Sequence, residues 1–441
     1  GYDVWRRQDQ SPFYPYELLK EQIETLQRFR RQNRPDLLVP YLQESLHRTL
    51  GELAEPRLYH VSMAGTKHLV ENYLDEIESM VDYLCDTDFE FIDKTQKRLL
   101  FKHARKNFGR SALMLSAGGA FGICHFGVIK TLLHHGLLPE VVAGSSMGAI
   151  VAGFIGTHRD EQILKILSEP ENQHFMPISW RKLGAMLEGQ SLMQPDQLME
   201  CIRSNIPDDT FLEAYQKTGR VINITVSPTR SGQKPRILNY KTAANVLVRY
   251  ACKASASIPI AFPPVQLMAK SEGGELIPYM ASELWADGGV STDIPMGRMG
   301  RLHNINHFIV SQTNPHVLPF VTNRNRPGLV PYLADLASAS VHAQLHQFIV
   351  TSKKRIPSRE ARVWLDRADS LLGQDYLGDI NLHPEFPLKR YLNILSNPSM
   401  AEVHEYILAG ERSTWPKLAM IRNQTRISRV LRRCAVRLEE T

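Results

Sequence analysis

The chain has 441 residues, of which 43% are hydrophobic and 22% are charged, and its formal net charge is +6. This composition is typical of a globular protein with one large catalytic domain and helical additions, or with two to three domains. The small net charge and the absence of a recognition motif exclude a nucleic-acid-binding protein. Five scattered cysteines show neither disulfide nor zinc spacing, so we expect a reducing compartment and no metal site.

No apolar run in the sequence reaches eighteen residues, the length that spans a bilayer, and no signal peptide is visible. The nearest run, residues 141–156, is shorter. Because the chain begins with Gly1 rather than Met, we expect it to be an excerpt of a longer protein, and the missing part could hold a targeting or membrane segment.

Residues 1–105 are predicted to be helical. Apolar side chains recur at helical spacing over residues 16–32, and a wider apolar stripe runs over residues 66–85. We expect this region to be a packed helical domain that supports the rest of the chain. The arginines within residues 28–34 are expected on a solvated helix face, with contact to anionic lipid as the alternative.

A glycine-rich loop follows the first predicted buried strand, residues 112–116. The loop consists of Gly118, Gly119, Ala120, Phe121 and Gly122, and a helix is predicted after it. Such a loop directs several backbone N–H groups, and the positive end of the helix dipole, at one spot. That spot binds either a phosphate or the oxyanion of an acyl-transfer transition state. A dinucleotide is disfavoured, because the glycine spacing is not G-x-G-x-x-G.

The next predicted strand ends in a G-x-S-x-G sequence, which is typical of a nucleophile elbow. Its residues are Gly144, Ser146 and Gly148, with Met147 directly after the serine. A strand that reverses sharply into a helix strains the central residue and exposes its hydroxyl, and only small residues fit two positions before and after it. An elbow next to the glycine-rich loop favours acyl chemistry with Ser146 as the nucleophile.

The block from Gly118 to Val128, followed by the elbow, resembles the patatin-like phospholipase family. The resemblance extends over roughly residues 111–315 and includes residues 254–264. It implies a Ser–Asp dyad rather than a triad, with the aspartate in a downstream Asp-Gly-Gly turn. Asp287, Gly288 and Gly289 supply that turn, so Asp287 is the implied general base for Ser146.

A Ser–Asp–His triad is the mechanistic alternative, because histidines follow Asp287 in the chain order of the α/β-hydrolases. The candidates are His303, His307 and His316. We favour the dyad, since the resemblance implies no histidine and a Gly-Gly turn can present the carboxylate directly. His125, one turn into the helix after the glycine-rich loop, is expected to have a structural role.

Two further segments each have two interpretations. An aromatic and methionine-rich patch within residues 175–193 is either core or an acyl-chain groove over Ser146. The last predicted helix binds an anionic lipid surface or packs on the core with solvated cations. Its arginines precede any acidic residue of that helix and are interleaved with apolar side chains: Arg422, Arg426, Arg429, Arg432, Arg433 and Arg437.

Residues 59–73 and 411–418 resemble a subgroup, the intracellular triacylglycerol lipases of fungi and plants. This narrower resemblance implies that the substrate is the triacylglycerol of lipid droplets. It also implies a location at a lipid-droplet or intracellular membrane surface, on its cytoplasmic side.

These features together predict an α/β fold: a three-layer α/β/α patatin-like domain with a mainly parallel central sheet, flanked by helical regions. The expected domains are residues 1–105, 106–318 and 319–441. The expected activity is hydrolysis of triacylglycerol esters by Ser146 and Asp287 without metal or cofactor, with backbone amides of the glycine-rich loop as the oxyanion hole. The alternatives are a phospholipase or lysophospholipid transacylase with the same dyad, and a non-catalytic lipid-droplet binding protein. The sequence predicts no oligomeric state.

Overall fold

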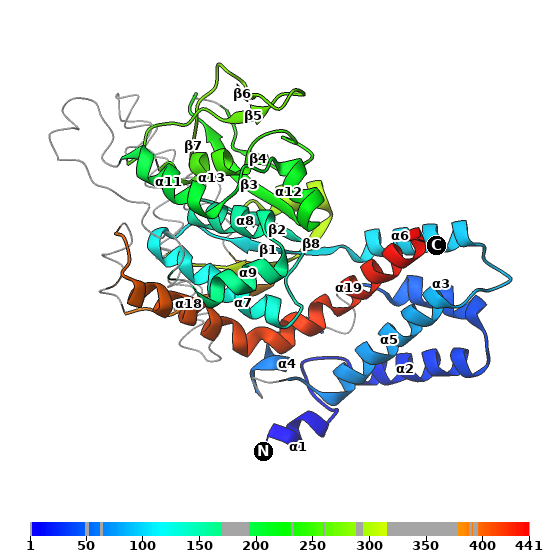
Figure 1. The fold of residues 1–441 in the computed structure, drawn as a ribbon. Helices are drawn as coiled ribbons and strands as arrows, with labels where there is room; N and C mark the ends of the chain where they lie inside the picture. The colour runs from blue at the N-terminus through cyan, green and yellow to red at the C-terminus, as the bar shows by residue number, and fades with distance from the viewer. Residues whose placement is uncertain are drawn as a thin grey trace, which may run out of the picture. The chain divides into compact units, whose positions relative to one another are not determined.

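The structure is a computed structural model (Figure 1). It describes residues 2–48, 53–61, 65–169, 171, 194–230, 233–258, 261–287, 294–314, 377–387, 390 and 396–440. The chain forms two compact units. The first combines Gly1–Ser111, Met299–His307 and Trp415–Thr441, and the second combines Ala112–Arg298 and Phe308–Thr414. The three-domain division stays a prediction, and in the structure the last helix belongs to the first unit.

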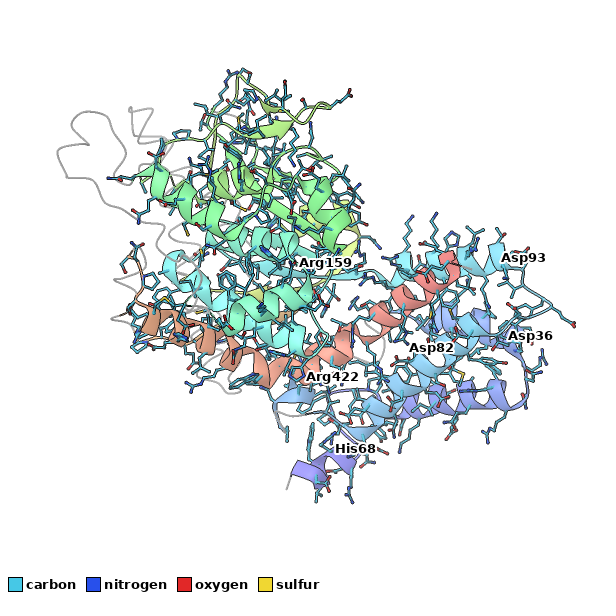
Figure 2. All side chains as sticks on the ribbon, viewed as in Figure 1. Asp36, His68, Asp82, Asp93, Arg159 and Arg422 are labelled. Atoms are coloured by element: carbon cyan, nitrogen blue, oxygen red, sulfur yellow. The ribbon has the colours of Figure 1, made fainter. Side chains whose placement is uncertain are left out.

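The first unit is helical, as the apolar spacing predicts. All eight apolar residues of the predicted stripe between Leu69 and Leu84 are buried. Asp93, labelled in Figure 2, begins one helix with a reciprocal capping box, in which its side chain accepts from the backbone of Gln96. The helices are α1 (Tyr2–Arg7), α2 (Tyr16–Arg31), α3 (Pro35–Ser45), α4 (Arg57–His60), α5 (His68–Asp86), α6 (Lys94–Phe108) and α19 (Leu418–Glu440), the last preceded by a 3-10 turn at Trp415–Lys417.

The basic helix α19 packs within this unit against an acidic row on α5. Arg426 Nη1 lies 2.6 Å from Asp75, and its Nε pairs with Glu78. Arg433 contacts Asp82 at 2.7 Å and Arg437 contacts Asp86 at 2.9 Å. These acids recur about once per helical turn, so they form one row, and Figure 2 labels Asp82 within it. Three of the six arginines are therefore paired with carboxylates of the same unit, which favours the packed interpretation of this helix over the lipid-bound one.

The second unit is built on a mainly parallel sheet. Seven strands of the described chain form it, in the order β4–β3–β2–β1–β8–β9, with β7 paired to β3. The pairs β1–β2, β2–β3 and β8–β9 are parallel, whereas β4 and β7 run antiparallel to β3. The strands are β1 (Arg110–Leu115), β2 (Val141–Gly144), β3 (Val221–Pro228), β4 (Arg236–Leu238), β7 (Trp285–Asp287), β8 (Ile305–Ser311) and β9 (Ile380–Leu382).

Helices pack around this sheet (Figure 1), which confirms the predicted fold class. A 3-10 turn at Gly119–Ile123 leads into α7, and a separate two-stranded hairpin joins β5 (Met268–Lys270) to β6 (Leu276–Pro278). The helices of this unit are α7 (Cys124–His134), α8 (Met147–Thr157), α9 (Asp160–Ser168), α11 (Pro195–Asn205), α12 (Phe211–Thr218), α13 (Val248–Ala256) and α18 (Met400–Thr414). Helix α14 (Met296–His303) begins in this unit and ends in the first.

Glycines set the close approach of α7 and α18. A Cβ added to Gly127 of α7 would collide with the backbone carbonyl of Ile407, and one added to Gly410 of α18 would collide with that of Cys124. Both helices therefore need glycine at their crossing. Because α7 continues the glycine-rich loop, this contact also fixes the helix behind the candidate site.

Candidate active site

The elbow has the strained geometry that the G-x-S-x-G pattern predicts. Ser146, which is buried, follows β2 with φ 52° and ψ −121°, a conformation that costs a non-glycine residue about 1–3 kcal/mol. A Cβ at Gly144 would collide with the carbonyl of Gly148, and a Cβ at Gly148 would collide with the carbonyl of Leu115. The two glycines are therefore required by the close packing of the turn itself.

The sheet register brings Asp287 beside the elbow. On β3, Ile224 pairs with Gly144 of β2, and Val226 pairs with Asp287 of β7. Val226 also pairs with Arg236 of β4, on the opposite edge of β3. Strand β7 therefore lies along the same edge of β3 as β2, past the residue at which β2 ends. Two residues along a strand span about 7 Å. Asp287 thus lies directly beyond the end of β2, where the chain continues into Ser146.

Helix α13 holds both residues through its last turn. The Ser146 N–H donates to Ser255 Oγ at 3.0 Å, and the Asp287 N–H donates to the Ser257 carbonyl at 3.0 Å. The Ser257 hydroxyl in turn donates to the Lys253 carbonyl at 2.7 Å. Sequence reasoning marked this segment by its resemblance but assigned no role to either serine, because each partner is distant in the chain.

The glycine-rich loop lies against the elbow. A Cβ at Gly122 would collide with the Met147 side chain, and a Cβ at Gly118 would collide with Thr313. Phe121 is buried, and its N–H donates to the Gly118 carbonyl. No acceptor in the described part of the chain takes a hydrogen bond from the N–H of Gly119, Ala120 or Met147. These three donors, on two adjoining backbone segments, are free to bind an oxyanion.

His125, in α7, forms hydrogen bonds with the segment that leads into the glycine-rich loop, which fits the structural role expected for it. It is fully buried, with Nε2 2.9 Å from the Ser116 carbonyl and Nδ1 2.7 Å from Ser311 Oγ. A carbonyl only accepts, so the proton is on Nε2, and the serine hydroxyl donates to Nδ1. Burial lowers the pKa of His125 to about 4, so the ring is neutral at physiological pH.

Of the three candidate triad histidines, the structure describes His303 and His307, and it brings neither of them to the elbow. His307 lies near the start of β8, and its ring contacts Ser111 at 3.0 Å and Gln424 at 2.7 Å. His303 ends α14 and is also buried before that strand begins. The nucleophile follows the carboxyl end of its strand, so both histidines lie toward the opposite end of the parallel sheet. His316, Gly288, Gly289 and the patch within residues 175–193 lie outside the described residues.

The described residues show no sign of a metal site or of a membrane-spanning helix. In the described ranges, no group of three or more His, Cys, Asp or Glu side chains is arranged to hold a metal ion. Within those ranges, no helix has both the length and the apolar character that crossing a membrane requires.

A strained serine after one parallel strand, a carboxylate beyond that strand's end and a donor-rich loop on its neighbour define a serine acyl-hydrolase type of site. Residues 113–298 match the family model for patatin-like phospholipases, and residues 1–106 match a domain of unknown function, DUF3336. The chain belongs to the patatin-like phospholipase family, a family of serine lipid acyl hydrolases.

Relatives in plants and fungi match nearly all of this chain. It is 31% identical to triacylglycerol lipase SDP1L of Arabidopsis thaliana, with 97% of this chain and 54% of the relative covered. It is 31% identical to triacylglycerol lipase 4 of Saccharomyces cerevisiae, with 96% and 49% covered. The chain thus spans about half the length of these curated relatives. Among solved structures, VipD of Legionella pneumophila is 12% identical with a TM-score of 0.31, and the match covers 68% of this chain and 67% of VipD.

Proposed function

We propose that this chain hydrolyses acyl esters of lipids, that Ser146 and Asp287 are its catalytic dyad, and that triacylglycerol is its substrate. The observation that carries the dyad is the register of β3, which puts Asp287 next to the elbow. Triacylglycerol is favoured because two relatives of this chain carry that activity in their names.

The proposed reaction proceeds in two halves. Ser146 Oγ attacks the ester carbonyl carbon while Asp287 takes the hydroxyl proton, and the carbonyl oxygen becomes an oxyanion held by the free N–H groups of Gly119, Ala120 and Met147. The intermediate collapses, the C–O bond to the glycerol breaks, and Asp287 returns the proton to the leaving alcohol. Water then attacks the acyl-serine with Asp287 as base, which releases the fatty acid and restores Ser146.

We further propose that the chain works at a lipid-droplet or intracellular membrane surface, on its cytoplasmic side. The supporting feature is a group of exposed apolar side chains on the β5–β6 hairpin and the turn after it. Leu276 is 49% exposed, Ile277 42%, Met280 42% and Leu284 45%. Single exposed apolar residues are ordinary, but four large ones within nine consecutive residues are a mark of an interaction surface.

Charge and position both fit a lipid surface as the partner of these apolar side chains. Arg236 Nη1 contacts Met280 Sδ at 3.3 Å, so one cation borders the apolar residues. Arg230 donates to the Ser282 carbonyl at 2.9 Å, but it also lies 3.4 Å from the Glu283 carboxylate, which offsets its charge. Such a pattern combines insertion of apolar groups with attraction to anionic headgroups. Leu284 also lies directly before β7, which carries Asp287.

The test compares fatty-acid release from emulsified triacylglycerol and from phosphatidylcholine by the wild type, Ser146→Ala and Asp287→Asn. We expect triacylglycerol hydrolysis in the wild type and its loss in both variants, with unchanged circular dichroism. A preference for phosphatidylcholine would replace the substrate but keep the dyad, and transfer of the acyl group to a lysolipid would identify a transacylase. Absence of all acyl chemistry in the wild type would leave the non-catalytic binding protein, and activity in Ser146→Ala would refute the mechanism.

A further inference from the structure

The glycine-rich loop begins where two neighbouring strands of the sheet end, β1 and β8. The Ser116 N–H, just past β1, donates to the Ser311 carbonyl at 3.1 Å. Thr313, two residues beyond β8, then binds the start of the loop twice. Its N–H donates to the Ser116 hydroxyl oxygen at 2.8 Å, and its own hydroxyl donates to the Ala117 carbonyl at 3.1 Å. Thr313 is only 1% exposed, so water does not compete for either bond.

Three consecutive carbonyls at the start of the loop are held by hydrogen bonds. Their donors are His125 Nε2 for Ser116 at 2.9 Å, the Thr313 hydroxyl for Ala117, and the Phe121 N–H for Gly118 at 3.1 Å. These peptides are trans, so each carbonyl points opposite to the N–H of the next residue. The bonds that fix the carbonyls therefore also set the directions of the N–H groups that follow, including that of Gly119.

The Thr313 hydroxyl ties the peptide between Ala117 and Gly118 to the end of β8. The Ser116 hydroxyl also donates to the Ala117 carbonyl, at 2.8 Å, but it belongs to the same segment and moves with it. The Thr313 hydroxyl lies directly against Gly118, where an added Cβ would collide with it. The Gly119 N–H, one of the free donors of the loop, follows at the next residue, so its direction depends on this contact.

We propose that Thr313 is a positioning residue of the oxyanion hole. Its hydroxyl orients the peptide between Ala117 and Gly118, and through it the backbone from which the N–H groups of Gly119 and Ala120 bind the oxyanion. This role rests on the proposed function, because the oxyanion forms only when Ser146 attacks an ester. Since the hydroxyl acts through backbone donors, its removal should weaken binding of the transition state more than binding of the substrate.

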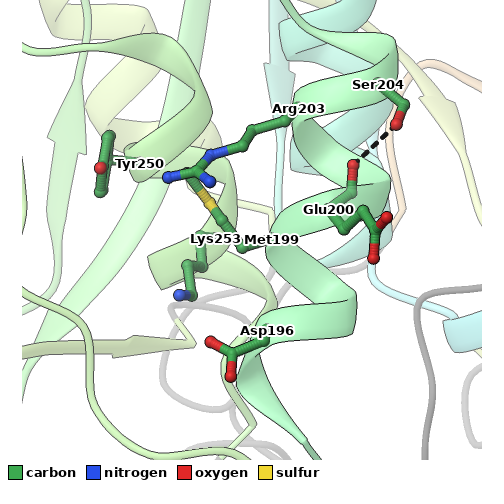
Figure 3. Close-up of a pocket in the computed structure, with 7 residues that line it drawn as sticks. All are labelled: Asp196, Met199, Glu200, Arg203, Ser204, Tyr250 and Lys253. Atoms are coloured by element: carbon green, nitrogen blue, oxygen red, sulfur yellow. Dashed lines mark hydrogen bonds between the residues drawn. The ribbon is translucent and has the colours of Figure 1, made fainter.

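The experiment compares variants of the whole chain that differ by single hydroxyl groups. Thr313→Val removes the hydroxyl and keeps most of the side-chain shape, whereas Thr313→Ser keeps the hydroxyl. Thr313→Ala differs from Thr313→Ser only in the hydroxyl, and this second pair tests the same point if the valine variant does not fold. Thr131→Val is the matched control, because Thr131 is also buried and donates to a carbonyl, that of Gly127 in its own helix, at 2.9 Å. Ser204→Ala, which removes an exposed hydroxyl bound to the Glu200 carbonyl (Figure 3), is the control for the alanine variant.

Two measurements separate the transition state from the substrate. Fatty-acid release from the lipid that the wild type cleaves best gives kcat and KM. Fluorine NMR titration gives the Kd of a long-chain trifluoromethyl ketone, to which the Ser146 hydroxyl adds. The tetrahedral adduct places its oxygen where the oxyanion of the reaction forms, so its affinity reports on the oxyanion hole. Thermal unfolding gives the Tm of each variant.

We expect Thr313→Val and Thr313→Ala to lower kcat about tenfold, to keep KM within about twofold, and to weaken binding of the ketone about tenfold. Thr313→Ser should keep kcat within about twofold, and both control variants should keep it even where Tm falls. A wild-type kcat in Thr313→Val, or an equal loss in Thr313→Ser or in Thr131→Val, would overturn the positioning role and leave the dyad standing. Absence of both hydrolysis and the ketone adduct in the wild type would instead refute the proposed function, and the positioning role with it.

Discussion

The hydroxyl of Ser255 accepts a hydrogen bond from the backbone N–H of Ser146, 3.0 Å away and 109 residues earlier in the chain. The strained backbone of the elbow is therefore supported by α13 as well as by its own glycines. The neighbouring Ser257 holds the backbone of Asp287 in the same way, through its carbonyl. One turn of helix thus sets both partners of the proposed dyad.

Removal of the Ser255 hydroxyl is expected to lower catalysis without loss of the fold. Ser255→Ala leaves the buried Ser146 N–H without its acceptor, a loss of about 1–1.5 kcal/mol, which corresponds to roughly a tenfold lower kcat if it acts on the transition state. The measurement is fatty-acid release at saturating substrate, with Ser168→Ala, an exposed helix-end serine, as control. An unchanged kcat in Ser255→Ala would show that the elbow holds its geometry without α13.

The buried His125 predicts a loss of stability in mild acid. Its pKa is lowered to about 4 by burial, from an ordinary value of 6.5, so the unfolded state binds a proton that the folded state does not over that window. Stability is complete above about pH 6.5, falls as the pH drops toward 4 and then levels, with a total loss of about 3 kcal/mol from this residue.

The check on His125 is the free energy of unfolding by urea between pH 7 and pH 4 in the wild type and in His125→Gln. Glutamine keeps a donor for the Ser116 carbonyl but does not titrate. The variant should show a shallower dependence of stability on pH, and equal slopes in both proteins would contradict the burial of a neutral ring.

The crossing of α7 and α18 should not tolerate a methyl group. Gly127→Ala would place Cβ against the Ile407 carbonyl, and the backbone there cannot yield without separation of the helices, so we expect a loss of about 2–4 kcal/mol. Gly297→Ala is the matched control, because a Cβ there meets open space within a helix and should be neutral or slightly stabilising. Thermal unfolding of both variants measures the difference, and similar Tm values would show that the helices are further apart.

Substitutions in the β5–β6 hairpin and in α19 are expected to have opposite effects on vesicle binding and on thermal stability. Ile277→Ser combined with Leu276→Ser removes exposed apolar groups and should weaken vesicle flotation several-fold with little change in Tm. Arg426→Gln should do the reverse, lowering Tm through loss of its pairs with Asp75 and Glu78 while flotation stays the same. A strong loss of flotation in Arg426→Gln alone would indicate that α19, rather than the hairpin, binds the lipid surface.

The elements that local patterns define could be predicted from the sequence. The elbow at Ser146 and the glycine-rich loop each lie within a few consecutive residues, and so does the turn that begins with Asp287. The register of β3 could not be predicted, because it depends on pairing between strands far apart in the chain. The ion pairs of α19 were missed for the same reason: Glu78, the partner of Arg426, lies 348 residues earlier. A charge pattern within one helix shows which face is basic but not which element covers it.

The Ser146–Asp287 dyad is tested most directly by covalent labelling with a fluorophosphonate, which reacts with an activated serine. Peptide mass spectrometry would locate the label in the wild type, Ser146→Ala and Asp287→Asn. We expect a single label on Ser146, none in Ser146→Ala, and labelling of Asp287→Asn slowed by at least about a hundredfold, because no base then accepts the hydroxyl proton. Labelling of another serine in Ser146→Ala, or an unchanged rate in Asp287→Asn, would contradict it.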